Sequence, residues 1–299
     1  MTAGEPAAGT GLRMLYSRPA SLDAALAVLG ADAGARCLAG GATLVAGMNA
    51  GLPKPSQVVS LQDIPGLRGM IVEADGAVRI AAMTVHAAVA AESRLAGGLA
   101  VVREAALQIA HPAIRNMGTL GGSLADADPN ADYPCALLAA GADIELAGPR
   151  GRRICPVDAF FLGRFTTALA AGEIIVGVKL PPPALEETST YLKFSRVDGD
   201  YATVSVAVRM GWRDGACTAI RIALGSCGGT PIRVPTAERA LVGTKLDVAA
   251  LRIAAGAYVA ACDPPSDFRG TADYRRMIIP GLLERAVRNA LNADRGIRS

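Results

Sequence analysis

Three consecutive prolines, Pro181 to Pro183, divide this chain of 299 residues. Proline lacks a backbone N–H and fixes φ, so such a run continues neither a helix nor a central strand. Hydrophobic residues make up 51% of the sequence, so each side of the break has enough of them to bury a core. We therefore expect one domain over residues 13–183 and a second over residues 184–299, preceded by a disordered tail at residues 1–12.

Before the prolines, short strand patterns alternate with helical patterns. Ser21 is a plausible N-cap for a helix that continues to Leu29. Strand patterns occupy residues 36–38, 57–61, 76–80, 143–146 and 174–178, and helical patterns occupy residues 84–110 and 136–140. Residues 116–134 are rich in glycine and short polar side chains, which predicts a loop.

After the prolines, the order of the elements changes. Strand patterns cover residues 191–194, 204–212 and 217–224, and helical patterns cover residues 236–241, 248–261 and 274–291. We expect Pro280 to kink or break the last helix. Strands followed by helices predict an α+β domain, and α+β is the fold class expected of the whole chain.

Two glycine-rich segments carry the clearest binding signal. Ala39–Thr43 follows a predicted strand, and its two glycines permit a close backbone approach, so that successive N–H groups form a nest for an anion. A plain turn is the alternative. Gly118–Ser123 has three glycines and two hydroxyls and leads into an acidic stretch that ends at Asp132. Hydroxyls bind phosphate oxygens and carboxylates accept from sugar hydroxyls, whereas a surface loop with Asx-turns is the alternative.

Other catalytic patterns are missing from the sequence. It contains no phosphate-binding G-x-x-x-x-G-K-[ST] segment and no G-x-G-x-x-G that opens a helix after the first strand. His86 and His111 are too few for a metal site, and each is more often structural than catalytic. The six cysteines include no C-x-x-C pair, which argues against an iron–sulfur cluster in this chain and is typical of reduced thiols. We therefore expect a cofactor to carry the chemistry.

Charge and hydropathy exclude further classes. The net charge is +3 without a dense Lys/Arg stripe, so no nucleic-acid partner is expected. Arg150, Arg152 and Arg153 are expected to lie in a solvated loop. The sequence has no run of about 18 apolar residues and no signal-peptide pattern, so we expect no membrane span and a cytoplasmic location.

The motifs together resemble the FAD-binding medium subunits of the molybdenum hydroxylases. This family includes carbon monoxide dehydrogenase, nicotine- and quinoline-type dehydrogenases, and the flavin domain of xanthine dehydrogenase. The resemblance extends from about Met14 to Leu291. The segments that carry it, in the family's order, are residues 38–44, 83–86, 115–132, 172–175, 193–196, 200–202 and 274–276.

The resemblance implies a PCMH-type FAD-binding fold of two α/β subdomains, over about residues 13–65 and 66–183. It also implies a C-terminal domain with a three-stranded antiparallel sheet and helices. It places the pyrophosphate at the two glycine segments, Asp132 at the ribityl chain and Ile175 on the adenine side. It places Lys193 near the polar edge of the flavin ring and Tyr201 over one ring face. The cofactor-binding positions that it implies are Ala39, Gly40, Gly41, Ala42, Thr43, Leu44, Thr84, His86, Gly118, Thr119, Gly121, Gly122, Ser123, Ala127, Asp128, Asp132, Ile175, Lys193 and Tyr201.

Three departures from the family pattern bear on these roles. Ala42 and Thr43 stand where some relatives have His and Ser, so a side-chain bond is lost while the backbone donors remain. Asp126 stands where many relatives have histidine. The chain also lacks the cysteine-bearing insertion of relatives with an extra iron–sulfur cluster, which disfavours chemistry of the benzoyl-CoA-reductase type.

The resemblance implies an electron-transfer role within an assembly of the (αβγ)2 type. A small subunit would pass electrons from [2Fe–2S] clusters to FAD, and a large subunit would hold the molybdopterin cofactor and hydroxylate the substrate. Reduced FAD would then reduce NAD⁺, a quinone, a cytochrome or O2. Two alternatives remain open from the sequence: a stand-alone flavin oxidase or reductase, and a binding module without enzymatic activity. Glu186 and Glu187 are expected to be a solvated pair in the linker.

Overall fold

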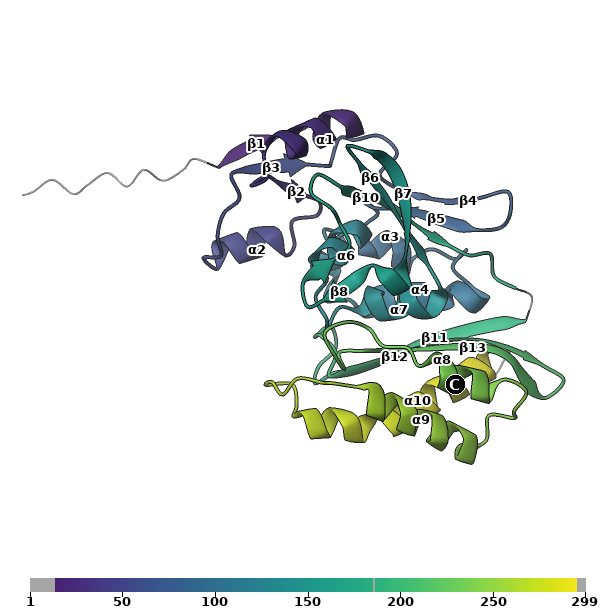
Figure 1. Ribbon diagram of the computed structural model, residues 1–299. Helices are drawn as coiled ribbons and strands as arrows, with labels where there is room; N and C mark the ends of the chain where they lie inside the picture. The colour runs from purple at the N-terminus through teal and green to yellow at the C-terminus, as the bar shows by residue number, and fades with distance from the viewer. Residues whose placement is uncertain (1–13, 185, 295–299) are drawn as a thin grey trace, which may run out of the picture.

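The structure, a computed structural model, describes residues 14–184 and 186–294. The tail expected at residues 1–12 lies outside these ranges. Figure 1 shows a small sheet at the top, a larger sheet with helices in the middle, and a third sheet backed by helices at the bottom. The order of these layers follows the order of the chain.

The top sheet is parallel, in the order β1 (Leu15–Ser17), β3 (Gln57–Ser60), β2 (Arg36–Leu38). Helix α1 (Leu22–Ala31) connects two of these strands, and its N-cap is Ser21, as predicted. The Ser21 hydroxyl accepts the N–H of Ala24 at 3.2 Å. Helix α2 (Leu44–Asn49), which the sequence reading missed, follows the first glycine segment and buries no residue.

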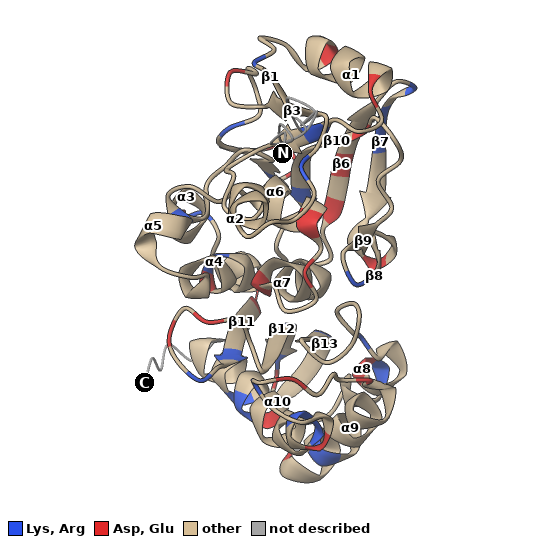
Figure 2. Cartoon of the chain, turned by 90° about the vertical axis from the view of Figure 1, so that its left-hand side faces the viewer, with Lys and Arg blue, Asp and Glu red and all other residues tan. Residues whose placement is uncertain are grey.

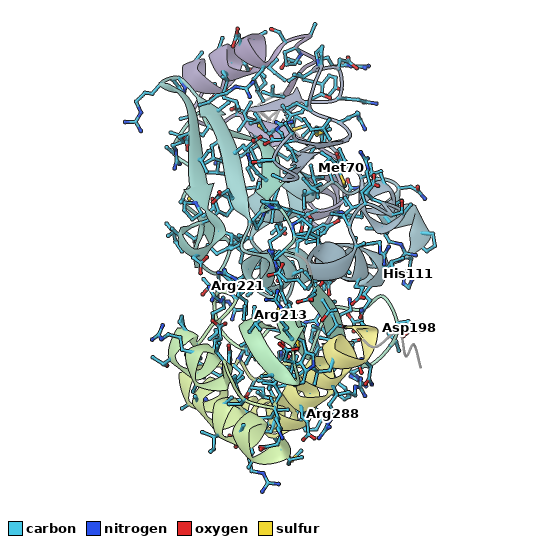
Figure 3. The ribbon with its side chains drawn as sticks, turned by 90° about the vertical axis from the view of Figure 1, so that its right-hand side faces the viewer. Met70, His111, Asp198, Arg213, Arg221 and Arg288 are labelled. Atoms are coloured by element: carbon cyan, nitrogen blue, oxygen red, sulfur yellow. The ribbon has the colours of Figure 1, made fainter. Side chains whose placement is uncertain are left out.

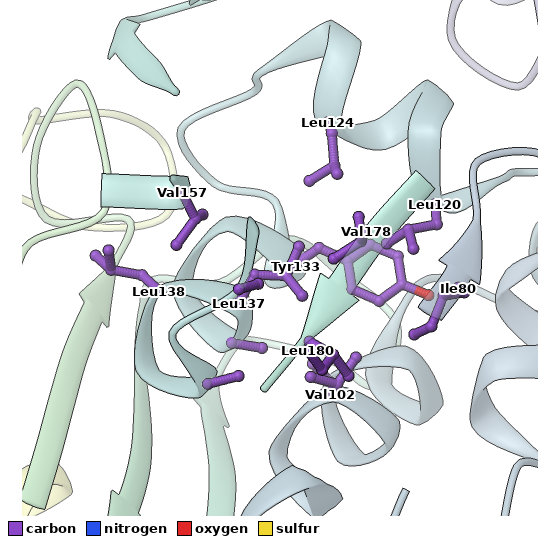
Figure 4. Close-up of a cluster of buried hydrophobic side chains, with 14 of the residues drawn as sticks. Ile80, Val102, Leu120, Leu124, Tyr133, Leu137, Leu138, Val157, Val178 and Leu180 are labelled. Carbon is purple, nitrogen blue, oxygen red and sulfur yellow. The ribbon is translucent and has the colours of Figure 1, made fainter. Parts of the chain in front are cut away.

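The middle sheet has five strands in the order β4-β5-β10-β6-β7, and all neighbouring strands are antiparallel. Apolar side chains of this sheet and its helices form one core, in which Leu120, Leu137 and Val178 surround Tyr133 (Figure 4). The strands are β4 (Met70–Val72), β5 (Val78–Ala81), β6 (Asp143–Gly148), β7 (Gly151–Pro156) and β10 (Ile174–Leu180). The helices are α3 (His86–Ala90), η1 (Gly97–Leu99), α4 (Ala100–Gln108), α5 (Pro112–Arg115), α6 (Leu120–Asp126), α7 (Asp132–Ala140) and η2 (Val157–Ala159).

About half of the loop expected over residues 116–134 is helical, in α6 and the start of α7, so that prediction was wrong for these residues. Helix α6 begins behind Thr119, whose side chain accepts the N–H of Gly122 at 3.1 Å and caps the helix. Gly121 lies inside α6 because the first turn of the helix packs against Ala82, where a Cβ on Gly121 would lie 2.7 Å from the Ala82 Cβ. A Cβ on the next glycine, Gly122, would lie 2.9 Å from the Thr119 hydroxyl oxygen. Glycine was therefore a sign of close packing here and not of a loop.

Two further expectations in this region need correction. The long helix over residues 84–110 is interrupted after α3, and the chain resumes as η1 and α4 where Gly97 and Gly98 pack against Glu187. The arginines expected in a solvated loop are partly in strand β7. One of them, Arg153, pairs with Glu173 at 2.6 Å. A short hairpin of β8 (Phe161–Gly163) and β9 (Thr166–Thr167) follows.

The C-terminal domain has the expected strands followed by helices. Strands β11 (Glu187–Phe194), β12 (Val204–Arg213) and β13 (Ala216–Gly225) form an antiparallel sheet. Helices α8 (Pro235–Leu241), α9 (Val248–Ala261) and α10 (Ala272–Asp294) cover one face of it (Figure 1). Pro280 lies inside α10 without ending it, so the expected break does not occur.

Arginines of the C-terminal sheet bind the end of helix α7 and join the two halves of the chain. Arg209 donates to the carbonyl of Ala140 at 2.7 Å, and Arg221 donates to the carbonyl of Leu138 at 2.9 Å. Figure 3 places Arg221 at the waist between the halves. The last carbonyls of a helix have no intrahelical donor and carry partial negative charge, so guanidinium groups stabilise this junction.

Charges are distributed over the fold without a continuous basic stripe on the face that Figure 2 shows. Within the described residues, no helix combines the length and the apolar character that a membrane crossing requires.

Candidate functional site

The two glycine segments meet backbone to backbone. A Cβ built on Gly40 would lie 1.9 Å from the carbonyl oxygen of Met117 and 2.9 Å from the Cα of Gly118. No side chain fits between them, so glycine is required at position 40. The fold thus joins two segments that are almost 80 residues apart in the sequence, as a shared binding site requires.

The N–H groups at the start of the second segment are used within the protein. They stabilise the attachment of α6 to the turn after β5, which makes this segment a rigid platform. Thr119 keeps its own O–H to donate, since its oxygen only accepts here. The hydrogen bonds are Leu120 N–H to Thr84 O (3.0 Å), Gly121 N–H to Ala82 O (2.8 Å), Gly122 N–H to Thr119 Oγ1 (3.1 Å) and Ser123 N–H to Thr119 O (3.0 Å).

The first segment supplies the free donors. In the described parts of the chain, the N–H groups of Gly40 to Leu44 have no protein acceptor. Gly41 has φ of +80°, and Thr43 stands at the N-cap of α2 without a side-chain cap bond. Successive unpaired N–H groups on such a backbone form a nest for an anion. The structure thus leaves the free backbone donors on the first segment and not on the second.

His86 packs against Gly118 of the second segment. A Cβ on Gly118 would lie 2.6 Å from Nε2 of His86, and the His86 N–H donates to the Gly118 carbonyl at 3.0 Å. Burial and the charge of Arg115 lower the pKa of His86 to about 4, so the ring is neutral at pH 7. Its Nδ1 is buried without a partner among the described residues, and the Tyr133 ring lies 5.3 Å away.

A buried ion pair lies at the start of α7. The carboxylate of Asp132 is 5% exposed and the side chain of Lys193 is 3% exposed. Their shortest N–O distance is 3.1 Å, and Lys193 also donates to the carbonyl of Gln108 at 2.6 Å. Tyr191 donates its hydroxyl to Asp132 at 2.6 Å. Burial raises the pKa of Asp132, while Lys193 and Tyr191 stabilise the charged carboxylate and oppose this rise.

Tyr201 lies beside the acidic end of the second segment. Its side chain is 42% exposed, and burial together with Asp128 and Asp126 raises its pKa to about 12. The guanidinium of Arg269 lies 5.4 Å from the centre of the Tyr201 ring and 4.2 Å from that of Phe268. Arg269 also lines a pocket of about 460 Å³ at this end of the C-terminal domain.

Several expected cofactor positions have structural contacts in the fold. The Thr84 hydroxyl exchanges hydrogen bonds with the backbone of Gly69, and Asp128 accepts the N–H of Asn130 in an Asx-turn. Ala127 ends α6 in the left-handed conformation, and Ile175 is buried in the core of the middle sheet. Their contacts with a cofactor stay predictions.

Sequence reasoning missed two residues that contact the buried ion pair, Tyr191 and Gln108. One signal for Tyr191 was present. It stands two residues before Lys193 on a predicted strand, and alternate residues of a strand face the same side. Nothing local in the sequence connects Gln108 with Lys193, because that contact joins residues 85 positions apart.

Comparisons with known proteins agree with this geometry. Residues 10–183 match the model of the FAD binding domain in molybdopterin dehydrogenase, and residues 189–290 match that of the CO dehydrogenase flavoprotein C-terminal domain. The chain belongs to the FAD-binding medium subunits of the molybdenum-containing dehydrogenases.

Individual relatives in this medium-subunit family cover almost the whole chain. The carbon monoxide dehydrogenase medium chain of Afipia carboxidovorans is 39% identical, over 92% of this chain and 96% of that protein. The nicotine 6-hydroxylase medium subunit of Paenarthrobacter nicotinovorans is 36% identical, over 91% of this chain and 95% of that protein. A crystal structure of Cu,Mo-CO dehydrogenase in its cyanide-inactivated form has a TM-score of 0.90 at 38% identity, covering 94% of this chain and 99% of that one.

The site of this medium subunit fits FAD. Unpaired N–H groups at Gly40–Leu44 match a pyrophosphate, because a nest of such donors binds an anion. The carboxylate of Asp132 and the ammonium of Lys193 match the hydroxyls of a ribityl chain and the polar edge of a flavin ring. The protein is thus an oxidoreductase subunit whose cofactor is FAD. The described residues hold no His/Cys/Asp/Glu group with the geometry of a metal site.

Proposed function

We propose that the chain relays electrons through FAD in a three-subunit molybdenum hydroxylase. Electrons enter from [2Fe–2S] clusters of a small subunit and leave to NAD⁺, a quinone, a cytochrome or O2. The observation that carries the proposal is the contact between Gly40 and Met117, which joins the segment with the free donors of Gly40–Leu44 to the start of the second glycine segment. This arrangement supports an extended dinucleotide between the two segments.

Each part of the site has a proposed role. The N–H groups of Gly40–Leu44 and the Thr119 and Ser123 hydroxyls hold the pyrophosphate. Asp132 accepts from polar groups of the ribityl region, and Lys193 donates to the polar edge of the ring. The remaining positions that the resemblance implies, Ala39, Thr84, His86, Gly118, Gly121, Gly122, Ala127, Asp128 and Ile175, are proposed to shape these subsites, with Ile175 on the adenine side.

The chain's own chemistry is binding and electrostatic tuning. When bound, FAD supplies the redox chemistry. The ammonium of Lys193 keeps a positive charge next to the ring, which favours the additional negative charge of reduction. Tyr201, partly exposed, covers one face of the ring and limits access for the electron acceptor. No residue of this chain is proposed to act on the hydroxylated substrate.

The partner subunits are inferred from the relatives. The names "medium chain" and "medium subunit" support a larger and a smaller partner. We infer that the large partner holds the molybdopterin cofactor, that the small partner holds the [2Fe–2S] clusters, and that the assembly is (αβγ)2. The cytoplasmic location stays a prediction.

Titration of the purified chain with FAD tests the binding. We expect saturable quenching of flavin fluorescence at one FAD per chain, and electron transfer to an acceptor only after the small and large subunits are added. A chain that binds no FAD would refute the proposal. Substrate turnover by the isolated chain would favour the stand-alone oxidase or reductase instead.

A further inference from the structure

The Tyr191 hydroxyl lies where two domains meet at the buried ion pair. Tyr191 is on β11, whereas its acceptor Asp132 is the first residue of α7. Tyr191 is 2% exposed, so water does not compete for the 2.6 Å bond between its hydroxyl and the carboxylate. A bond to an ionised acceptor in a dry environment is among the strongest hydrogen bonds of a protein.

Lys193 has one donor left after its contacts within the protein. An ammonium group carries three N–H donors. One donates to the Gln108 carbonyl at 2.6 Å, and one donates to Oδ2 of Asp132 at 3.2 Å. Oδ1 of Asp132, which accepts from Tyr191, lies 3.1 Å from the same nitrogen in the ion pair. The direction of the third N–H therefore depends on where the carboxylate of Asp132 is held, and the bond from Tyr191 restricts that position.

The backbone of β11 is fixed independently by helix α4. The side chain of Glu104 accepts the N–H of Tyr191 at 2.8 Å, and Gln108 donates its side-chain N–H to the Tyr191 carbonyl at 3.2 Å. Removal of the Tyr191 hydroxyl alone therefore leaves the strand in place and changes only the support of Asp132.

We propose that Tyr191 is a positioning residue of the cofactor site: through Asp132 it holds the ammonium of Lys193 so that one N–H faces the bound FAD. This inference rests on the proposed function, because it assumes that FAD binds at Lys193. Tyr191 acts through Asp132 and does not itself contact the ring.

The chain contains a matched control in Tyr133. This tyrosine is also fully buried, and its hydroxyl has no partner among the described residues (Figure 4). Tyr133→Phe therefore deletes the same atom one residue from Asp132 without removing a hydrogen bond. Tyr191→Phe removes the hydrogen bond to Asp132.

The test measures the FAD dissociation constant and the reduction potential of the bound flavin. In Tyr191→Phe, the carboxylate of Asp132 loses the Tyr191 hydrogen bond and keeps only its contact with Lys193. It then attracts the ammonium more strongly and draws it away from the ring. We expect about tenfold weaker FAD binding, as for the loss of one such bond, and a lower potential, because negative charge on the reduced ring loses a donor. Tyr133→Phe should match the wild type in both measurements.

Site-specific 3-fluorotyrosine at position 191 keeps the hydroxyl and nearly the same size, so folding is preserved. Its more acidic phenol donates more strongly to Asp132 and frees Lys193, so the potential should rise. If Tyr191→Phe does not fold, the reduction potential of the 3-fluorotyrosine variant tests the inference alone. An unchanged potential in the 191 variants, or an equal shift in Tyr133→Phe, would overturn the inference. Wild-type protein that binds no FAD would instead refute the proposed function.

Discussion

Substitution of Gly40 by alanine tests whether the contact between the glycine segments builds the site. The added Cβ would lie 1.9 Å from the Met117 carbonyl oxygen, 2.7 Å from its carbon and 2.9 Å from the Cα of Gly118. All three atoms belong to the backbone, so no side-chain rotation relieves the clash. The two segments must separate by about 1.5 Å before ordinary van der Waals contact is restored.

The expected magnitude follows from this separation. Forcing one methyl group into close-packed backbone costs about 1–3 kcal/mol of the free energy of unfolding. The free N–H groups of Gly40–Leu44 also move away from the second glycine segment, which weakens a pyrophosphate site that both segments form. Losing one hydrogen bond to a charged group costs about 1.5–3 kcal/mol, so the affinity for FAD should fall by about 10- to 100-fold.

Two measurements check this prediction: fluorescence titration of the apoprotein with FAD, and urea unfolding monitored by circular dichroism. Gly30→Ala is the matched control, because Gly30 lies in helix α1 and a Cβ there has no atom within 4 Å. That control should bind FAD normally and gain up to about 1 kcal/mol from helix propensity. Wild-type affinity and stability in Gly40→Ala would refute the reasoning, because the segments would then not be in contact.

Two further predictions concern buried charge. Arg275 is fully buried and donates to the carbonyls of Thr203 and Ser226 and to Asp267. Arg275→Met should therefore lower the free energy of unfolding by about 3–5 kcal/mol, and a loss below 1 kcal/mol in urea unfolding would contradict this. The pKa of His86 is lowered to about 4 in the folded state, so the unfolded chain binds an additional proton below pH 6.5 and stability falls as the pH drops from 6.5 towards 4. Between pH 7 and 4.5 the free energy of unfolding of the wild type should therefore fall by about 2–3 kcal/mol more than that of His86→Asn. If urea unfolding at the two pH values gives the same fall for both proteins, His86 is not buried in its neutral form.

Features that depend on neighbouring residues were predictable. The strands near residues 36–38 and 174–178, the three strands after Pro183 and the helix behind Ser21 follow from hydrophobic period and capping chemistry, which act over a few residues. The loop expected over residues 116–134 failed for the opposite reason. Glycine frees the backbone in a loop and also permits close packing of a helix, and only Ala82, far along the chain, decides between the two at Gly121.

The sequence by itself determined that two glycine segments exist and that the chain resembles a flavin-binding family. The roles of Asp132, Lys193 and Tyr201 as the polar and aromatic groups of the site stay predictions from that resemblance. Only the tertiary structure decided which N–H groups remain free for a ligand. In the second segment, N–H groups donate to the backbone carbonyls of Ala82 and Thr84, whereas the N–H groups of Gly40–Leu44 have no acceptor among the described residues. It also decided that Tyr191 supports Asp132. The physical reason is that hydrogen-bond satisfaction and burial are properties of contacts between distant segments, which no local pattern records.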